Sequence, residues 1–270
     1  VAVSGECKGL TLRRSILFNG ELVAADEHRL EALHSEPVEE GNEFTIPKLT
    51  VNGAKLWDTE SPALYVQRTE LIKEGRAVDC ADTRFGFRTA EFRADGFYLN
   101  GKKLKLRGLN RHQSYPFIGY AAPASIQRFD ADIIKNELGC NAVRTSHYPQ
   151  SPHFIDRCDE LGLLVFTEIP GWQHIGGKEW QDQAVENTAE MVERYRSHPS
   201  IILWGVRINE SRDNDELYQR TNAIAHALDP TRQTGGVRCY KKGSLSEDVF
   251  TYNDFFHDGR SEEHTSELQS

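Results

Sequence analysis

The chain carries two different patterns of hydrophobic and polar positions, which change near residue 88. Before it, segments 43–51 and 64–72 alternate or carry β-branched and aromatic residues, and Gly, Pro and Asn-Gly turns bound them. This pattern predicts β-strands. No helical period of useful length occurs there. We therefore expect residues 1–88 to form an immunoglobulin-like β-sandwich that is incomplete at its N-terminal side.

After residue 88 a hairpin is predicted first, because Asn100-Gly101 supplies the positive φ angles of a two-residue turn. Short apolar strands then alternate with amphipathic helices. The strands are expected at 103–107, 142–145, 163–167, 201–206, 233–237 and 249–252, and the helices at 125–138, 152–161, 184–195 and 216–228.

The first of these helices is predicted to begin at a Ser125 cap and to bury Ile126, Phe129, Ile133 and Leu138. The second is predicted to begin with Ser151 and Pro152 as N-cap and first helical residue. Repeated βα units of this length indicate a (β/α)8 TIM barrel or a doubly wound sheet. No glycine-rich phosphate loop follows the first strand, which weakens the doubly wound alternative. We expect residues 89–259 to hold about six of the eight barrel strands.

Composition narrows the function. The formal net charge is −9 and Lys and Arg are not clustered, which argues against nucleic acid or an anionic membrane as partner. No apolar run reaches the length of a membrane span. Five cysteines without CxxC spacing predict free thiols in a reducing compartment, and so favour the cytoplasm, although no targeting segment can be judged.

Polar side chains gather where the predicted strands end, which is where barrels carry their chemistry. The strand-end groups are Asn110 to His112, Arg144 to Tyr148, Glu168, Asn209 with Glu210, and Tyr252 with Asn253. Polar, aromatic and carboxylate groups together suit sugar hydroxyls and an oxocarbenium-like transition state. Glycoside hydrolysis needs two carboxyl groups, about 5–5.5 Å apart where configuration is retained.

Several segments resemble glycoside hydrolase family 2. The two longest are Asn141-Ala-Val-Arg-Thr-Ser-His-Tyr-Pro149, continuing to Phe166, and Ser197-His-Pro-Ser-Ile-Ile-Leu-Trp-Gly-Val-Arg-Ile-Asn-Glu210. Shorter ones are Trp57 to Tyr65 and Thr83 to Arg88, which resemble the close of the family's immunoglobulin-like domain, and Gly108 to His112, which resembles the end of its first barrel strand.

The resemblance implies that Glu210 is the general acid/base, with a pKa raised by burial and by the nucleophile. It implies that Asn209 donates to the sugar 2-hydroxyl, that Arg144 orients the nucleophile, and that His147 and His112 contact the sugar. Trp172 is expected to form an aromatic wall, and Tyr252 to correspond to a tyrosine beside the nucleophile. Glu168 is expected to be structural.

No cofactor is expected. Some β-galactosidases of the family bind magnesium through a Glu-x-His pair, and Trp172 and His174 stand at the corresponding positions here. The Glu ligand is therefore missing, and we predict no metal site.

The implied activity is that of a retaining β-glycosidase that acts on a β-linked carbohydrate, with β-galactosides favoured over β-glucuronides or β-mannosides. A non-catalytic carbohydrate-binding protein is the alternative from another class, and a homo-oligomer is possible for a full-length parent. The family's nucleophile lies on the seventh strand, which we expect to be absent. Without that nucleophile we expect the fragment to be inactive. Residues 260–270 resemble a translated sequencing adapter, and we expect them not to be natural protein.

Overall fold

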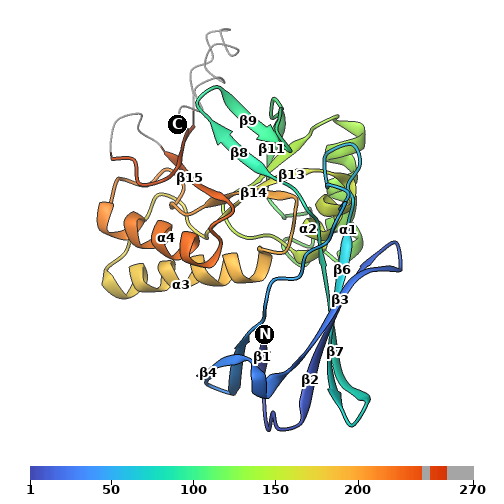
Figure 1. Cartoon of the computed structure of the whole chain (residues 1–270). Coiled ribbons are helices and arrows are strands. Elements are labelled where there is room, and N and C mark those ends of the chain that lie inside the picture. Colours follow the sequence, from blue (N-terminus) through green and yellow to red (C-terminus); the bar gives the residue numbers. More distant parts are fainter. Residues whose placement is uncertain (239–243, 254–270) are drawn as a thin grey trace. The chain divides into compact units, whose positions relative to one another are not determined.

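The computed structural model describes residues 1–238 and 244–253, and within them the chain forms two compact units. The first comprises Val1–Lys55 and Ala63–Phe87, and the second comprises Leu56–Pro62 and the chain from Arg88 onward (Figure 1). The predicted tail at 260–270 and Cys239 lie outside the described residues. The division at residues 88 and 89 stays a prediction.

The first unit consists of two antiparallel sheets. The four-stranded sheet has the order β3-β2-β6-β7 and the three-stranded sheet has the order β1-β5-β4. Their strands are β1 (Ala2–Val3), β2 (Leu10–Phe18), β3 (Glu21–Arg29), β4 (His34–Val38), β5 (Gly41–Thr45), β6 (Tyr65–Lys73) and β7 (Arg76–Phe85). Val3, Leu10, Leu12, Leu30 and Phe44 form its buried cluster. The expected sandwich-like sheets are confirmed, although the strand predicted at 43–51 ends at Thr45, two residues before Pro47.

The second unit contains six parallel strands hydrogen-bonded in chain order, as a partial TIM barrel requires. They are β11 (Gly108–Arg111), β12 (Ala142–Thr145), β13 (Leu164–Glu168), β14 (Ile201–Gly205), β15 (Gln233–Arg238) and β16 (Val249–Tyr252). All five residues of β14 are buried, as expected for a strand covered on both faces. Because the strands are parallel, their carboxyl ends meet at one edge, where the candidate residues lie.

The boundary between the hairpin and the first barrel strand differs from the prediction. The hairpin β8 (Ala90–Arg93), β9 (Gly96–Leu99) and β10 (Lys102–Lys103) turns at Asn100 and Gly101, which both have positive φ as predicted. The strand predicted at 103–107 is wrong, since β11 begins only at Gly108. Lys103 pairs with Tyr98 in the hairpin, so the alternating Leu104 and Leu106 do not begin the barrel.

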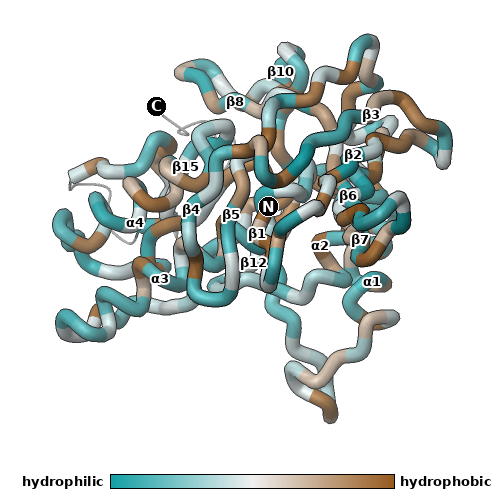
Figure 2. Tube along the Cα trace, turned by 60° about the horizontal axis from the view of Figure 1, so that its bottom comes forward, coloured by the Kyte–Doolittle hydropathy of each residue, from teal (hydrophilic) through white to brown (hydrophobic). Residues whose placement is uncertain are grey.

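Four helices follow strands of this sheet: α1 (Ala124–Asp132, continued by a π-helical turn at Ile133–Glu137), α2 (Pro152–Leu161), α3 (Lys178–Tyr195) and α4 (Asp215–Leu228). Teal and brown positions alternate along α3 and α4 in Figure 2, as in helices with one buried face. No helix in the described part of the chain is both long and apolar enough to cross a bilayer.

The predicted face of α1 is wrong. Phe129 and Leu138 are exposed, and the helix buries Gln127, Ala131 and Ile134 instead. Arg111 binds the Gln127 side chain at 2.8 Å, and the π-helical turn shifts the phase of the residues that follow. Ser125 does not cap the helix, because Pro123 occupies the N-cap position.

Candidate active site

Glu210 lies at the carboxyl end of the β14 segment, and three side chains donate hydrogen bonds to its carboxylate. Trp172 Nε1 and Gln173 Nε2 donate to Oε2 at 3.1 and 3.0 Å, and Asn253 Nδ2 donates to Oε1. Trp172 and Gln173 follow β13, and Asn253 follows β16. Two segments that are distant in the sequence, one after β13 and one after β16, therefore hold the Glu210 carboxylate.

These contacts set the ionisation of Glu210. Burial alone raises the pKa of the carboxyl group, but the hydrogen bonds from Gln173, Trp172 and Asn253, with the charge of His147, outweigh it. The pKa of Glu210 therefore lies below its ordinary value. The prediction of a raised pKa is therefore wrong for the described residues: burial is the largest single influence on the Glu210 pKa, but the three hydrogen bonds and the charge of His147 together exceed it.

The backbone of Glu210 adopts a left-handed conformation, with φ of 54°. Residues other than glycine rarely adopt this backbone conformation, so it needs support from the surrounding structure. The amide of Glu210 donates to the Val237 carbonyl at 2.9 Å, which joins it to β15. Such local strain is frequent at functional sites.

Arg144, at the end of β12, links two of the other candidate residues. Its Nε and Nη2 donate to Glu168 at 2.6 and 3.0 Å, and Nη2 also donates to Asn209 Oδ1 at 2.6 Å. Glu168 is 1% exposed and both of its oxygens accept from Arg144. This contact agrees with a structural role for Glu168.

Asn209 is almost fully buried beside Glu210. Its Oδ1 accepts from Arg144, and its Nδ2 donates to no group among the residues that the structure describes. A buried amide donor without a partner is costly, so such groups call for an explanation. A substrate hydroxyl would satisfy this one.

The two histidines lie together beside Arg144. His147 Nδ1 is 3.2 Å from Arg144 Nη2 and 3.3 Å from Glu168 Oε2, so it accepts from the first in one tautomer and donates to the second in the other. The His112 ring packs edge-on against His147 at 5.3 Å. Burial, and then the charge of His147, lower the pKa of His112, which favours its neutral form.

Two contacts to Glu210 were not predicted from the sequence. No motif in the sequence indicates Gln173, and Asn253 stands in it only as the residue after Tyr252 at a strand end. Tyr252 ends β16 as predicted, but it is Asn253 that contacts Glu210. The only sequence signal for Asn253 was its position directly after a strand.

The residues at the family's magnesium position do not fit a metal ion. The Trp172 indole N–H donates to Glu210, and the His174 ring packs edge-on against Trp180 at 5.8 Å. Neither position offers a carboxylate, which Mg²⁺ prefers.

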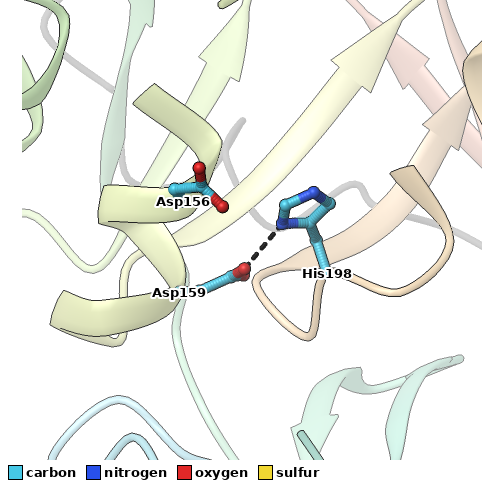
Figure 3. A group of neighbouring side chains, drawn as sticks. All are labelled: Asp156, Asp159 and His198. Atoms are coloured by element: carbon cyan, nitrogen blue, oxygen red, sulfur yellow. Dashed lines mark hydrogen bonds and ion pairs between the residues drawn. The ribbon is translucent and has the colours of Figure 1, made fainter. Parts of the chain in front are cut away.

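Another group of possible ligands, Asp156, Asp159 and His198, lies where the loop before β14 meets α2 (Figure 3). His198 Nδ1 is 2.6 Å from Asp159 Oδ2, and the Ser200 amide donates to Oδ1 at 3.1 Å. Both Asp159 oxygens therefore bind the 198–200 segment, and the group positions the start of β14.

The six parallel strands, with Asn209 and Glu210 at their carboxyl edge, define the second unit as a partial TIM barrel with a candidate catalytic site. The profile of the Glycosyl hydrolases family 2 TIM barrel domain matches residues 90–258, and that of Glycosyl hydrolases family 2 matches residues 10–88. The chain belongs to glycoside hydrolase family 2.

Individual relatives agree with this membership. A beta-galactosidase of Thermoanaerobacterium thermosulfurigenes is 62% identical over 205 residues, which cover 76% of this chain and 28% of the relative. A beta-galactosidase of Rhizobium meliloti is 38% identical, with 94% and 34% covered. The structure of Bacteroides uniformis beta-glucuronidase 3 superposes with a TM-score of 0.79 at 31% identity, covering 96% of this chain and 34% of that one. The chain thus spans about a third of the length of these proteins.

Proposed function

We propose that this chain supplies the acid/base half of a retaining β-glycosidase site, and that the preferred substrates are terminal β-galactosides. The observation that supports this most is the Asn209–Glu210 pair. The Glu210 carboxylate accepts hydrogen bonds from three donors. Beside it, the buried Asn209 Nδ2 has no hydrogen-bond partner among the described residues.

In the proposed first step, protonated Glu210 gives its proton to the glycosidic oxygen as the bond to the anomeric carbon breaks. A carboxylate nucleophile forms the new bond to that carbon. In the second step the Glu210 carboxylate takes a proton from water, whose oxygen displaces the enzyme carboxylate. Asn209 Nδ2 donates to the sugar 2-hydroxyl, an interaction that strengthens at the transition state.

The low pKa of Glu210 bears on this mechanism. In the free site the group is a carboxylate near neutral pH, which suits its role as base in the second step. A negatively charged neighbour or a bound sugar that displaces a donor would raise its pKa for the first step. We assign no nucleophile among the described residues, since Arg144 engages both oxygens of Glu168.

The roles proposed for the other residues follow their positions. Trp172 contacts the Glu210 carboxylate, His147 contacts Arg144, and the His112 ring packs against His147. These three side chains would contact sugar hydroxyls and the apolar sugar face. Arg144 would orient carboxylates near the anomeric carbon. We propose that Tyr252 lies beside the nucleophile in the complete site. No step of the proposed mechanism requires a metal ion.

β-Galactosides are proposed because two beta-galactosidases match this chain at 62% and 38% identity. The matched beta-glucuronidase structure supports β-glucuronides as the second candidate. The test is a barrel chimaera, in which residues 90–258 of this chain replace the corresponding segment of the Thermoanaerobacterium thermosulfurigenes enzyme. We expect it to hydrolyse nitrophenyl β-galactoside faster than the β-glucuronide or β-mannoside.

Glu210→Gln in the barrel chimaera tests the acid role. Hydrolysis of alkyl β-galactosides, whose leaving groups need a proton, should fall by about 10²–10⁴-fold, and dinitrophenyl β-galactoside should be affected much less in its first step. Glu160→Gln is the matched control, because Glu160 on α2 pairs with Arg128 of α1 and Arg157 of α2, and no contact joins it to Glu210 or Asn209 among the described residues. Equal losses for both leaving groups would contradict the acid role. A folded chimaera that binds galactose without turnover would favour the non-catalytic alternative.

A further inference from the structure

The segment that leads to Glu210 bulges away from β15. The Val206 amide donates to Gly235 O, and the next bond to this strand runs from the Glu210 amide to Val237 O, both at 2.9 Å. The chain therefore advances four residues on one side and two on the other, which places two extra residues before the carboxylate. Bulges of this kind redirect side chains beside active sites.

Arg207, in this bulge, belongs to a ring of four charged side chains. Its Nε donates to Glu247 Oε1 at 2.5 Å and its Nη1 to Asp213 Oδ1 at 2.8 Å. Arg238, the last residue of β15, donates to Glu247 Oε2 at 2.6 Å and to Asp213 Oδ1 at 3.4 Å. Each carboxylate thus bridges both guanidinium groups, and the four formal charges cancel.

Three of the four side chains of the ring are buried, and the fourth, Asp213, is 34% exposed. The side chains of Arg207, Arg238 and Glu247 are each at most 2% exposed. The Arg207 guanidinium lies over the Tyr218 ring at 4.0 Å, which also fixes its position. A buried charge is costly without an opposite charge beside it, so loss of one partner has a large effect on the others.

The ring connects to Glu210 through two backbone paths. The first is the bulge itself, since Arg207 is three residues before Glu210. The second runs through β15, where Arg238 O accepts from the amide of Asn253 at 3.0 Å. The Asn253 side chain donates to the Glu210 carboxylate. Both the acid/base and one of its three donors are therefore attached to residues that the ring holds.

We propose that the ring of Arg207, Glu247, Arg238 and Asp213 is a positioning device, which fixes the bulge before Glu210 and so orients its carboxylate for proton transfer. The catalytic meaning of this orientation rests on the proposed function. The geometric part does not, because it concerns only how Glu210 is held.

The experiment measures the pKa of Glu210 in the full chain by ¹³C NMR of labelled glutamate carboxyl groups, with the signal identified through Glu210→Gln. In Glu247→Gln the bulge and Asn253 should shift, and Glu210 should lose hydrogen bonds that favour its charged form. We expect its pKa to rise by about one unit. Glu247→Asp, which keeps the charge, should restore part of the difference.

The matched control is Asp229→Asn. Asp229 and Arg232 form a buried ion pair at 2.5 Å just before β15 begins, so this variant also breaks a buried pair but at the opposite end of the same strand. The pKa of Glu210 should stay unchanged in it. If Glu247→Gln does not fold, Asp213→Asn at the partly exposed member of the ring should give a smaller rise.

An unchanged Glu210 pKa in a folded ring variant, or an equal rise in Asp229→Asn, would overturn the proposal. The measurement needs no substrate, so its failure is distinct from a failure of the proposed glycosidase activity. Conversely, a barrel chimaera without turnover would leave the NMR result standing.

Discussion

At the residue scale, the amide of Asn209 has a fixed direction. Arg144 Nη2 donates to Oδ1 at 2.6 Å, so the oxygen side of the amide is committed and Nδ2 is available on the other side. Arg144 is itself held by Glu168, which is buried on β13. Glu168 therefore contributes to the site through Arg144 and Asn209.

Replacing Asn209 tests this donor. In the barrel chimaera, Asn209→Ala should lower kcat/KM for nitrophenyl β-galactoside by about 10²–10³-fold, as removal of one transition-state donor does elsewhere. The 2-deoxy substrate lacks the hydroxyl that Nδ2 would bind, so its kcat/KM should fall much less. Steady-state kinetics with both substrates measure the difference.

A loss of the same size for the two substrates would mean that Asn209 only supports the site. Glu160→Gln again serves as the control that should leave both rates unchanged, because Glu160 lies on α2 with partners of its own.

The sequence predicted Arg144, Asn209 and Glu210 because they lie within long motifs. It did not predict Gln173. The backbone of this residue is left-handed, with φ of 60°, and its side-chain amide donates to Glu210. Nor did the sequence predict the direction of the Glu210 pKa, since that depends on the balance between burial and three hydrogen bonds from two distant segments. Such a balance is a property of the folded geometry.

At the element scale, β15 depends on close approach to the bulge before Glu210. A Cβ atom added to Gly236 would lie 2.2 Å from the Cβ of Arg207 and 3.1 Å from Glu247 Oε1. The absence of a side chain at Gly236 therefore permits the position of the charged ring. This requirement is steric, because Gly236 does not have a positive φ.

Gly236→Ala should consequently destabilise the second unit by about 1–3 kcal/mol, as overpacking of a buried site does. Chemical denaturation followed by circular dichroism measures the free energy of unfolding. Gly177→Ala is the comparison, because no atom lies within 4 Å of an added Cβ there, and it should change stability by less than about 0.5 kcal/mol. Equal changes in the free energy of unfolding for the two variants would show that the structure accommodates the added methyl group at Gly236 without cost.

The elements themselves were predictable to different degrees. The strand at 249–252 and the helix at 152–161 match the prediction, since an apolar strand and a Pro-led helix leave few alternatives. The buried face of α1 was not predictable, because the Arg111 contact to Gln127 and the π-helical turn set its rotation. Tertiary contacts override helical periodicity there.

At the scale of the whole molecule, the two compact units correspond to different fold classes, which the change of hydrophobic period near residue 88 predicted. Within residues 1–238 and 244–253, the parallel sheet ends in β11 on one side and β16 on the other. Each of these strands pairs with one neighbour only among those residues. Unpaired strand edges favour association between chains.

We therefore expect the chain to self-associate as its concentration rises. Leu109 in β11 is 46% exposed, and the edge strand would present it to a second copy. Leu109→Lys should lower the weight-average mass measured by light scattering, because a charge opposes pairing of such an edge. Leu138→Lys is the control, since Leu138 is similarly exposed but follows the α1 helix. A mass that is constant with concentration, or that both variants lower equally, would show that the β11 edge does not drive association.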